Sequence, residues 1–387
     1  MLVVHRHLAR ATTRFLIRRN SSSIPPLSSV EKWKESFRKN NREIAKRPFL
    51  CDQLVADKVV KAFLPAPKED ANPQDGKIVI EAYPGAGALT RSLLALPPSR
   101  LKKLIVLEDN PVLFNDLKVL EQHDPRITVI PRSGFLWLSY TELEAQGLLK
   151  DVNPVAWKSE AQPNLHFISH LPNTVHGDQL LNQIFRCMPM ESWLFKYGRV
   201  PLSFLMTESI WERTSADIKS GTRCKLSVIA EAVSDCTKVV PSSDMHYNEH
   251  FYPPTGVDDE VPAKKKRKSA GRQSGVPYVA VNVEPRAKSF IKPGLLDKWD
   301  FILRKLFVLK ASPLQKGIPS IAPGAASLMS ILKNHIPGGN CLDTEKQIRR
   351  LTVEDWALIV EAFDAWPFAP EDLLVTDTFY RDIERKT

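Results

Sequence analysis

Short apolar runs with the character of strands alternate along the chain with longer stretches in which apolar residues recur every three or four positions. Runs bounded by polar or turn-forming residues are typical of buried strands, and the longer spacing is typical of amphipathic helices. This alternation predicts βαβ units and therefore a mainly parallel sheet. The strand runs are residues 78–81, 104–108, 127–130 and 165–169, and the helical stretches between them include 112–121 and 178–186.

The first of these strands leads into a glycine loop. Residues 77–96 read KIVIEAYPGAGALTRSLLAL, so a strand pattern is followed by YPGAG at 83–87 and then by leucines at helical spacing. The third glycine of a dinucleotide loop and the Gly-Lys-Ser/Thr of a Walker loop are both missing. The first two strands end in acids, Glu81 and Glu108, and Glu108 stands where a carboxylate bonds ribose hydroxyls in such sheets. The pattern predicts a nucleoside ligand without a phosphate chain.

Pattern and composition divide the chain into parts. We expect an α/β domain over residues 30–286 and a helical domain over 287–387, where apolar residues recur at helical spacing and Thr352 can cap a second helix. Residues 255–276 carry prolines, glycines and the run KKKRK, and we expect a flexible basic insertion there. This insertion is either a solvated loop or a loop that contacts phosphates.

Composition and charge narrow the class of protein. The 387 residues are 43% hydrophobic, which is enough for a folded core, and the net charge of +10 favours polyanionic partners. Arg6, Arg10, Arg14 and Arg18 share one helical face with no acid before Glu31, which predicts a mitochondrial transit peptide over residues 1–23 and a place in the mitochondrial matrix. A disordered basic tail is the alternative. No apolar run approaches the ~20 residues of a membrane-spanning helix, so we expect no membrane segment.

The cysteines and histidines give little sign of metal or disulfide chemistry. The five cysteines contain no C-x-x-C pair, which argues against a disulfide framework and a zinc ribbon. His246 and His250 have the spacing of a helical metal pair, but the prolines at 253–254 argue against a helix there. We therefore expect no metal cofactor.

Several segments, in this order, resemble the rRNA adenine N6-dimethyltransferase family. They are PFLCD at 48–52, the strand and loop at 81–90 with the strand at 104–108, KLSVI at 225–229, HFYPP at 250–254, and LTVE at 351–354 followed by WP at 366–367. The resemblance spans residues 45–370 and implies an α/β, Rossmann-like S-adenosylmethionine-dependent methyltransferase fold with a small C-terminal helical domain. The positions that it implies for the methyl donor are Leu50, Tyr83, Gly85, Gly87, Glu108 and His170.

The chain departs from this family at positions that carry the chemistry. Tyr83 stands where the loop has a glycine, and the segment 131–134 lacks the acid that reads the adenine amino group. The catalytic segment of the family is Asn-(Leu/Ile)-Pro-(Tyr/Phe), whose aromatic ring stacks on the flipped base. The matching residues here are His170, Leu171, Pro172 and Asn173. We assign no catalytic residue among them, because His170 and Asn173 can equally cap a strand end, and we expect donor binding to be weak or vestigial.

A changed catalytic segment together with mitochondrial import resembles the mitochondrial transcription factor B branch of the family, in particular its fungal form. That form has E-x-Y-P-G-x-G, found here at 81–87, and a G-(D/E)-Q-L-L segment, found here at 177–181. The resemblance implies a specificity factor that joins a single-subunit mitochondrial RNA polymerase at promoter DNA and assists melting. The alternative is an active mitochondrial rRNA adenine dimethyltransferase that uses S-adenosylmethionine.

Basic residues with aromatics between them follow the segment 170–173. We expect some of them to line one side of a groove for promoter DNA and single-stranded nucleic acid, with the helical domain as the other wall. The expected contacts are Arg199, Arg213, Arg223 and Lys225, with Lys219, Phe195, Tyr197 and Trp211 beside them and Lys305, Lys310 and Lys316 opposite. In the alternative reading the aromatics are core and the charges form a solvated face.

Overall fold

The computed structural model describes residues 24–37, 44, 47–66, 76–255, 275–334 and 342–373. The predicted transit peptide, and residues 256–274 of the predicted insertion, lie outside the described residues. The described part contains a seven-stranded sheet, a separate pair of short strands and a set of C-terminal helices.

The main sheet has the strand order β4-β3-β2-β5-β6-β9-β7. Neighbours from β4 to β6 are parallel, whereas β9 is antiparallel to both β6 and β7, so the prediction of a mainly parallel sheet is confirmed. The strands are β2 (Lys77–Ala82), β3 (Leu101–Leu107), β4 (Ile127–Ile130), β5 (Leu165–His170), β6 (Leu202–Thr207), β7 (Ser234–Val240) and β9 (Tyr278–Pro285), and the separate antiparallel pair is β1 (Phe49–Leu50) with β8 (Phe251–Tyr252).

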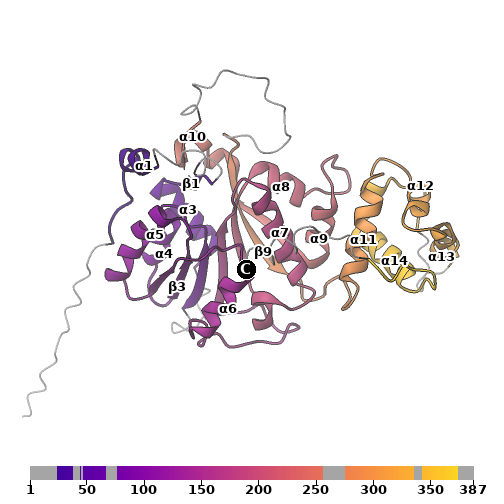
Figure 1. Cartoon of the computed structure of the whole chain (residues 1–387), viewed down its shortest axis with the longest axis horizontal. Helices are drawn as coiled ribbons and strands as arrows, with labels where there is room; N and C mark the ends of the chain where they lie inside the picture. Colours follow the sequence, from indigo (N-terminus) through magenta and orange to yellow (C-terminus); the bar gives the residue numbers. More distant parts are fainter. Residues whose placement is uncertain are drawn as a thin grey trace, which may run out of the picture.

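Helices lie on both sides of the sheet (Figure 1). Alternate strand residues pack with one helical layer or the other. Val79 and Ile168 pack with the buried faces of α3, α4 and α5, while Ile80 and Phe167 pack with those of α6, α7 and α9. The side-chain period of two therefore places each strand between two apolar layers, as in other doubly covered parallel sheets. The helices of these layers are α3 (Gln53–Phe63), α4 (Ala88–Leu94), α5 (Pro111–Lys118), α6 (Trp137–Ala145), α7 (Val175–Cys187), α8 (Glu208–Thr214) and α9 (Lys225–Val233), and α1 (Val30–Ser36) precedes them.

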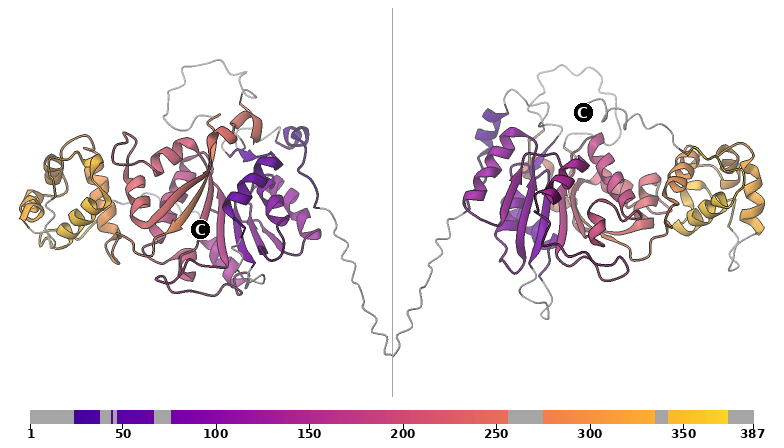
Figure 2. Two further views of the ribbon diagram at one scale, coloured as in Figure 1. Left: turned by 180° about the vertical axis from the view of Figure 1, so that it is seen from behind. Right: turned by 60° about the horizontal axis from the view of Figure 1, so that its bottom comes forward.

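The C-terminal part is helical, as predicted, and lies at one end of the molecule beside α9 (Figures 1 and 2). Thr352 caps the last helix as expected, because its hydroxyl accepts from the Asp355 N–H while the Asp355 carboxylate accepts from the Thr352 N–H. Trp299 and Trp356 belong to the same hydrophobic core as the sheet residue Phe167. The boundary at residue 287 stays a prediction. The helices are α11 (Leu296–Phe307), α12 (Leu314–Gly317), α13 (Leu328–Asn334) and α14 (Val353–Asp364).

Two features differ from the sequence analysis. The apolar run of β6 and the polar edge strand β7 were not among the predicted strands. The prediction that the histidine pair is not helical was wrong for one turn, α10 (Tyr247–His250), which ends where β8 begins. This turn places the His250 Nδ1 2.9 Å from Asp52 Oδ2.

Two features are absent from the described residues. No helix there is long and apolar enough to cross a membrane. The same residues contain no cluster of three or more His, Cys, Asp or Glu side chains that could hold a metal ion.

Candidate functional site

The chain order of the strands defines a crevice at the carboxyl edge of the sheet. From β2 the chain moves outward through β3 and β4 on one side, then returns to add β5 and β6 on the other side. Ligands of open α/β sheets bind at such a switch point, outside the carboxyl ends of the strands. The loop after β2, Glu108 after β3 and Leu171 after β5 therefore lie at the same edge of the sheet.

The glycine loop is held tightly against the short strand β1. Gly85 has a left-handed backbone with φ of 62°, and a Cβ at this position would lie 2.1 Å from Cβ of Phe49. Only glycine fits there. Leu50, predicted to contact a methyl donor, is buried in the core on this side of the sheet and pairs with Phe251. Gly87 begins α4 with φ of 83°.

Tyr83 keeps a backbone that is typical of glycine but adds a large side chain. Its φ is 58°, a region that costs most residues about 1 kcal/mol or more. The ring is buried, and its hydroxyl lies 3.2 Å from the Ser133 hydroxyl, in the segment where the related family carries an acid. The loop is therefore closed by one of its own side chains.

The carboxylate of Glu108 is bound by Arg47, a residue that the sequence analysis did not single out. Arg47 Nη2 lies 2.6 Å from Glu108 Oε2, and Nη1 lies 2.7 Å from Asp109 Oδ1. The guanidinium also lies 4.6 Å from the centroid of the Tyr83 ring, within the range of a cation–π contact. The second oxygen of Glu108 accepts from the Asn110 N–H at 2.8 Å. Both oxygens of the Glu108 carboxylate, which was predicted to bind ribose hydroxyls, thus have partners within the chain.

Burial governs the charges in this crevice. It raises the pKa of Glu108 to about 7, and the Arg47 guanidinium acts in the opposite direction. Burial alone would lower the pKa of Arg47, but the Glu108 and Asp109 carboxylates outweigh it and raise that pKa, so Arg47 stays protonated. Burial also raises the pKa of Tyr83 to about 12, so its hydroxyl stays neutral. The Arg47 guanidinium therefore contacts the Glu108 and Asp109 carboxylates and the Tyr83 ring at the same time.

Beneath the loop lies a second buried acid, Glu81. Its Oε2 accepts from the Thr90 hydroxyl at 2.8 Å, and no partner for Oε1 lies in the described part of the chain. Burial raises the pKa of Glu81 to about 8. The carboxyl links β2 to α4 from inside the core and does not face the crevice as a free charge.

His170, at the start of the segment that replaces the catalytic one, is a core residue. It is 5% exposed and lies edge-on to Tyr278, with ring centroids 5.0 Å apart. Burial, with a smaller contribution from Arg47, lowers the pKa of His170 to about 3, so the ring is neutral. A neutral, packed imidazole supports the reading in which this residue ends a strand.

The rest of this segment is fixed by the backbone. The Leu171 N–H donates to the Leu205 carbonyl at 2.8 Å, and Leu171 and Pro172 are both buried. Asn173 is half-buried and takes part in contacts. A Cβ on Gly177 would lie 2.0 Å from the Pro172 carbonyl oxygen, so α7 sits directly against the segment. The segment 170–173 is thus held in place by backbone contacts, but its last residue, Asn173, has no aromatic ring.

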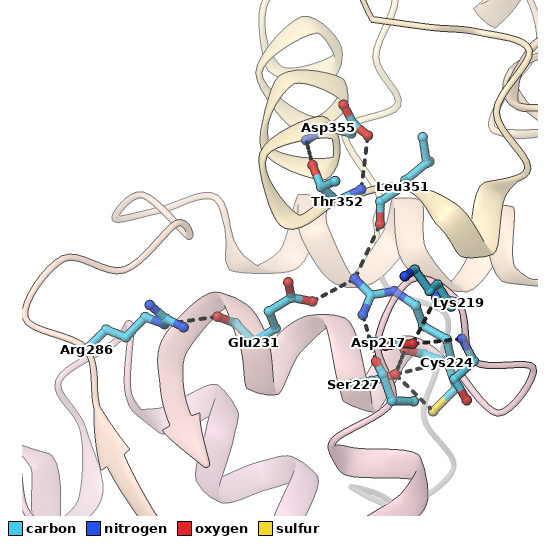
Figure 3. Close-up of polar contacts among 12 residues, drawn as sticks. Asp217, Lys219, Cys224, Ser227, Glu231, Arg286, Leu351, Thr352 and Asp355 are labelled. Atoms are coloured by element: carbon cyan, nitrogen blue, oxygen red, sulfur yellow. Dashed lines mark hydrogen bonds and ion pairs between the residues drawn. The ribbon is translucent and has the colours of Figure 1, made fainter. Parts of the chain in front are cut away.

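Arg223, predicted to contact nucleic acid, lies inside the molecule at the junction with the helical part. It is 1% exposed. Its Nη1 donates to the Ala216 carbonyl at 2.8 Å, and its Nη2 contacts Glu231 Oε2 at 2.7 Å and the Leu351 carbonyl at 3.3 Å. Figure 3 shows Glu231 on one side and Leu351, next to the capped helix, on the other. The prediction of a phosphate contact is not supported for Arg223, because its position makes it a structural bridge.

The other predicted contacts are spread along the chain. Arg199 donates to the carbonyls of Trp157, Ser159 and Pro285 and thereby ties a loop to β9. Arg213 pairs with Asp178 at 2.8 Å, and Lys225 pairs with Asp300 at 3.0 Å. Phe195 is buried in the core, which agrees with the alternative reading of the aromatics. A role of Arg213 and Lys225 in nucleic-acid binding stays a prediction.

Comparison with known proteins identifies the family. Residues 38–364 match the family described as ribosomal RNA adenine dimethylase. This match covers most of the chain and includes the loop after β2, the acid after β3 and the capped C-terminal helix. The chain therefore belongs to the ribosomal RNA adenine dimethylase family, as the sequence analysis predicted.

Relatives within the family carry two kinds of name. Mitochondrial transcription factor 1 of Saccharomyces cerevisiae is 24% identical over 304 residues, covering 76% of this chain and 82% of that protein. Mitochondrial dimethyladenosine transferase 1 of Bos taurus is 23% identical over 307 residues, covering 79% and 78%. Both names are mitochondrial, which supports a mitochondrial location for this chain.

A solved structure confirms the fold. The crystal structure of a dimethyladenosine transferase from Plasmodium falciparum matches with a TM-score of 0.52 at 18% identity, covering 82% of this chain and 97% of that one. This fold supports a site for S-adenosylmethionine in the crevice. The side chains found there do not fit such a nucleoside as they are arranged, because Arg47 occupies the Glu108 carboxylate and the Tyr83 ring closes the loop.

Proposed function

We propose that this protein is a mitochondrial transcription initiation factor that assists a single-subunit mitochondrial RNA polymerase in promoter melting. The observation that carries the proposal is the ion pair between Arg47 and Glu108, which places a side chain where a methyl donor would bind its ribose. A family member whose donor crevice is filled from within has kept the fold and given up the reaction. The similarity to Mitochondrial transcription factor 1 supports the same conclusion.

The chemistry of the reacting segment supports a role without catalysis. An exocyclic adenine nitrogen is a poor nucleophile, so an enzyme must hold it with aligned acceptors and a stacked ring. His170 is packed in the core, and Asn173 offers no π-face. A surface that once received a flipped base can still hold unpaired bases of a melted promoter without reacting. Its place would be the matrix, where mitochondrial promoters are transcribed.

A second candidate is an active rRNA adenine dimethyltransferase. The observation that favours it is that Glu108, Leu171 and Pro172 keep their places at the ends of β3 and β5. The name of the Bos taurus relative points to the same activity. This candidate requires Arg47, whose side chain is 18% exposed, to leave Glu108 when the donor arrives.

Run-off transcription separates the two candidates. Purified mitochondrial RNA polymerase is given a linear promoter template with and without this protein, and initiation at the promoter should depend on the protein. In parallel, the protein is incubated with labelled S-adenosylmethionine and a small-subunit rRNA hairpin, and no methyl transfer should occur. Methyl transfer with no effect on transcription would overturn the proposal and establish the second candidate.

A further inference from the structure

The loop between α8 and α9 is exposed and internally braced. Asp217 Oδ1 accepts from the backbone N–H groups of Lys219 and Ser220, both at 2.9 Å, which fixes a turn. The hydroxyls of Ser220 and Thr222 lie 2.7 Å apart at its tip. Gly221 between them is exposed and has no side chain, so a ligand can approach the backbone closely.

Two cations from the helical part reach this loop. Lys310 Nζ donates to the Gly221 carbonyl at 3.0 Å. Arg349 Nη1 lies 3.9 Å from the position that a Cβ of Gly221 would take. The two residues also share a backbone bond, from Arg349 N–H to the Lys310 carbonyl at 3.0 Å. Lys219 adds an exposed third cation from the loop itself.

This cluster has an excess of positive charge. In the part of the chain that the structure describes, no carboxylate forms an ion pair within 4.0 Å of Lys219, Lys310 or Arg349. The nearest acid in sequence, Asp217, accepts from two backbone N–H groups through Oδ1, and its one negative charge is outnumbered by the three cations. The Nε of Arg349 donates to Gln347 at 3.2 Å. Like charges gathered without a counter-ion repel each other, and an anion bound among them removes that cost.

We propose that Lys219, Lys310 and Arg349 form a binding site for a phosphate of a nucleic-acid strand. A phosphodiester matches the charged donors present, because a guanidinium and ammonium groups donate to its oxygens. The Thr222 hydroxyl donates to the Glu212 carbonyl at 3.3 Å and, with the Ser220 hydroxyl, braces the loop. The exposed glycine lets the phosphate reach the loop backbone. The site lies at the junction that Arg223 holds together, so a bound strand contacts both parts of the protein. It rests on the proposed function, which supplies the nucleic acid.

A salt titration tests the site. The double variant Lys219→Gln, Arg349→Gln keeps the Lys310 contact and removes two charges. The matched control Lys102→Gln, Lys150→Gln removes two exposed charges elsewhere on the sheet domain. Binding of a fluorescent 20-nucleotide single-stranded DNA is followed by anisotropy between 50 and 300 mM KCl. The affinity of complexes held by phosphate contacts falls about tenfold or more over this range of salt concentration, so the slope can be measured.

The double variant should bind at least about tenfold more weakly at low salt, with a log–log slope shallower by about 1.4, since each phosphate neutralised on a single strand contributes about 0.7. The control should keep the slope of the unchanged protein. Equal slopes in the double variant and the control would overturn the site. If the double variant melts early, Lys219→Gln alone should still reduce the slope by about 0.7. An unchanged slope in that single variant also counts against the site.

Transcription separates this inference from the proposed function. A double variant with a reduced slope and weaker run-off transcription supports both. If the double variant has a reduced slope but the unchanged protein itself has no effect on transcription, the phosphate site is supported and the promoter role is overturned. If the double variant keeps the slope of the unchanged protein, and the unchanged protein promotes initiation, the phosphate site is overturned and the promoter role stands.

Discussion

Arg47 and Glu108 form an ion pair inside the crevice, with 2.6 Å between Nη2 and Oε2. Glu108 is fully buried, so its charge would be costly without this partner. Arg47 thus stabilises the carboxylate and at the same time prevents it from binding an external hydroxyl. The ion pair therefore stabilises a buried charge and occupies the carboxylate at the same time.

Opening the crevice should create affinity for the methyl donor. We expect Arg47→Ala combined with Tyr83→Gly to bind S-adenosylmethionine at least about tenfold more tightly than the unchanged protein, because a contact to a buried polar group is worth about 1–3 kcal/mol. Isothermal titration calorimetry measures the dissociation constant. Arg132→Ala, which removes a surface cation paired with Glu142, is the control and should bind as weakly as the unchanged protein. A micromolar dissociation constant for the unchanged protein would contradict a closed crevice.

The buried Glu81 should make stability fall with rising pH. Its pKa is about 8 in the folded protein and 4.5 as an ordinary carboxyl, so its contribution is full below pH 4.5 and is lost as the pH rises through 8. Glu81→Gln stays neutral and should gain stability relative to the unchanged protein as the pH rises from 5 to 8, by up to about 1.4 kcal/mol for each pH step of one. Urea unfolding at several pH values measures this difference.

A second variant checks the origin of that pH dependence. Thr90→Val removes the hydroxyl that donates to Glu81 and opposes the rise of its pKa. The loss of stability should therefore continue to a higher pH than in the unchanged protein, with about the same slope between pH 5 and 7. Parallel curves for Glu81→Gln and the unchanged protein would show that Glu81 does not carry the effect.

Removing the buried cation at the domain junction should destabilise the protein. Arg223→Ala leaves the carbonyls of Ala216 and Leu351 without a donor and is expected to cost about 2–4 kcal/mol in urea unfolding. The control Arg132→Ala removes an exposed pair and should cost less than about 1 kcal/mol. Equal losses in the two variants would mean that Arg223 does not bridge the junction.

Contact between α7 and the segment before it should make one helical glycine irreplaceable. Alanine normally stabilises a helix by about 0.5–1 kcal/mol over glycine. Gly177→Ala should instead destabilise by about 2 kcal/mol or more, because its Cβ would overlap the Pro172 carbonyl. Gly147→Ala meets nothing within 4 Å, and its φ of 66° should cost about 1 kcal/mol. Thermal unfolding compares the two, and a Gly177→Ala protein as stable as the unchanged one would rule out the close contact.

Local pattern predicts one edge strand of the sheet, β4, but not the strand at the opposite edge, β7. The strand β4 is predictable to the residue because ITVI lies between Arg126 and Pro131. β7 is not, since it alternates polar residues with few apolar ones and depends on pairing with β9, which begins after residue 277. Such pairing is decided by tertiary contacts, which no short window of sequence contains.

In the candidate site, too, some residues can be predicted from the local sequence and others only from the fold. Tyr83 and Glu108 are predictable because each follows directly from the end of a strand. Arg47 lies in a basic stretch without periodicity, and its partner is 61 positions away, so only the fold brings them together. In the sequence Arg223 is one more cation beside Lys225, and only the fold shows that α9 and the helical part enclose it.

Tyr83 and Arg47 act as a permanently bound ligand, with a consequence for regulation. A diffusible ligand stabilises a protein by an amount that grows with the logarithm of its concentration, so the folded fraction follows the supply of that ligand. A side chain that fills the same place is present at a constant effective concentration, whatever the surroundings contain. We therefore expect the folded fraction of this protein to be independent of the concentration of the methyl donor.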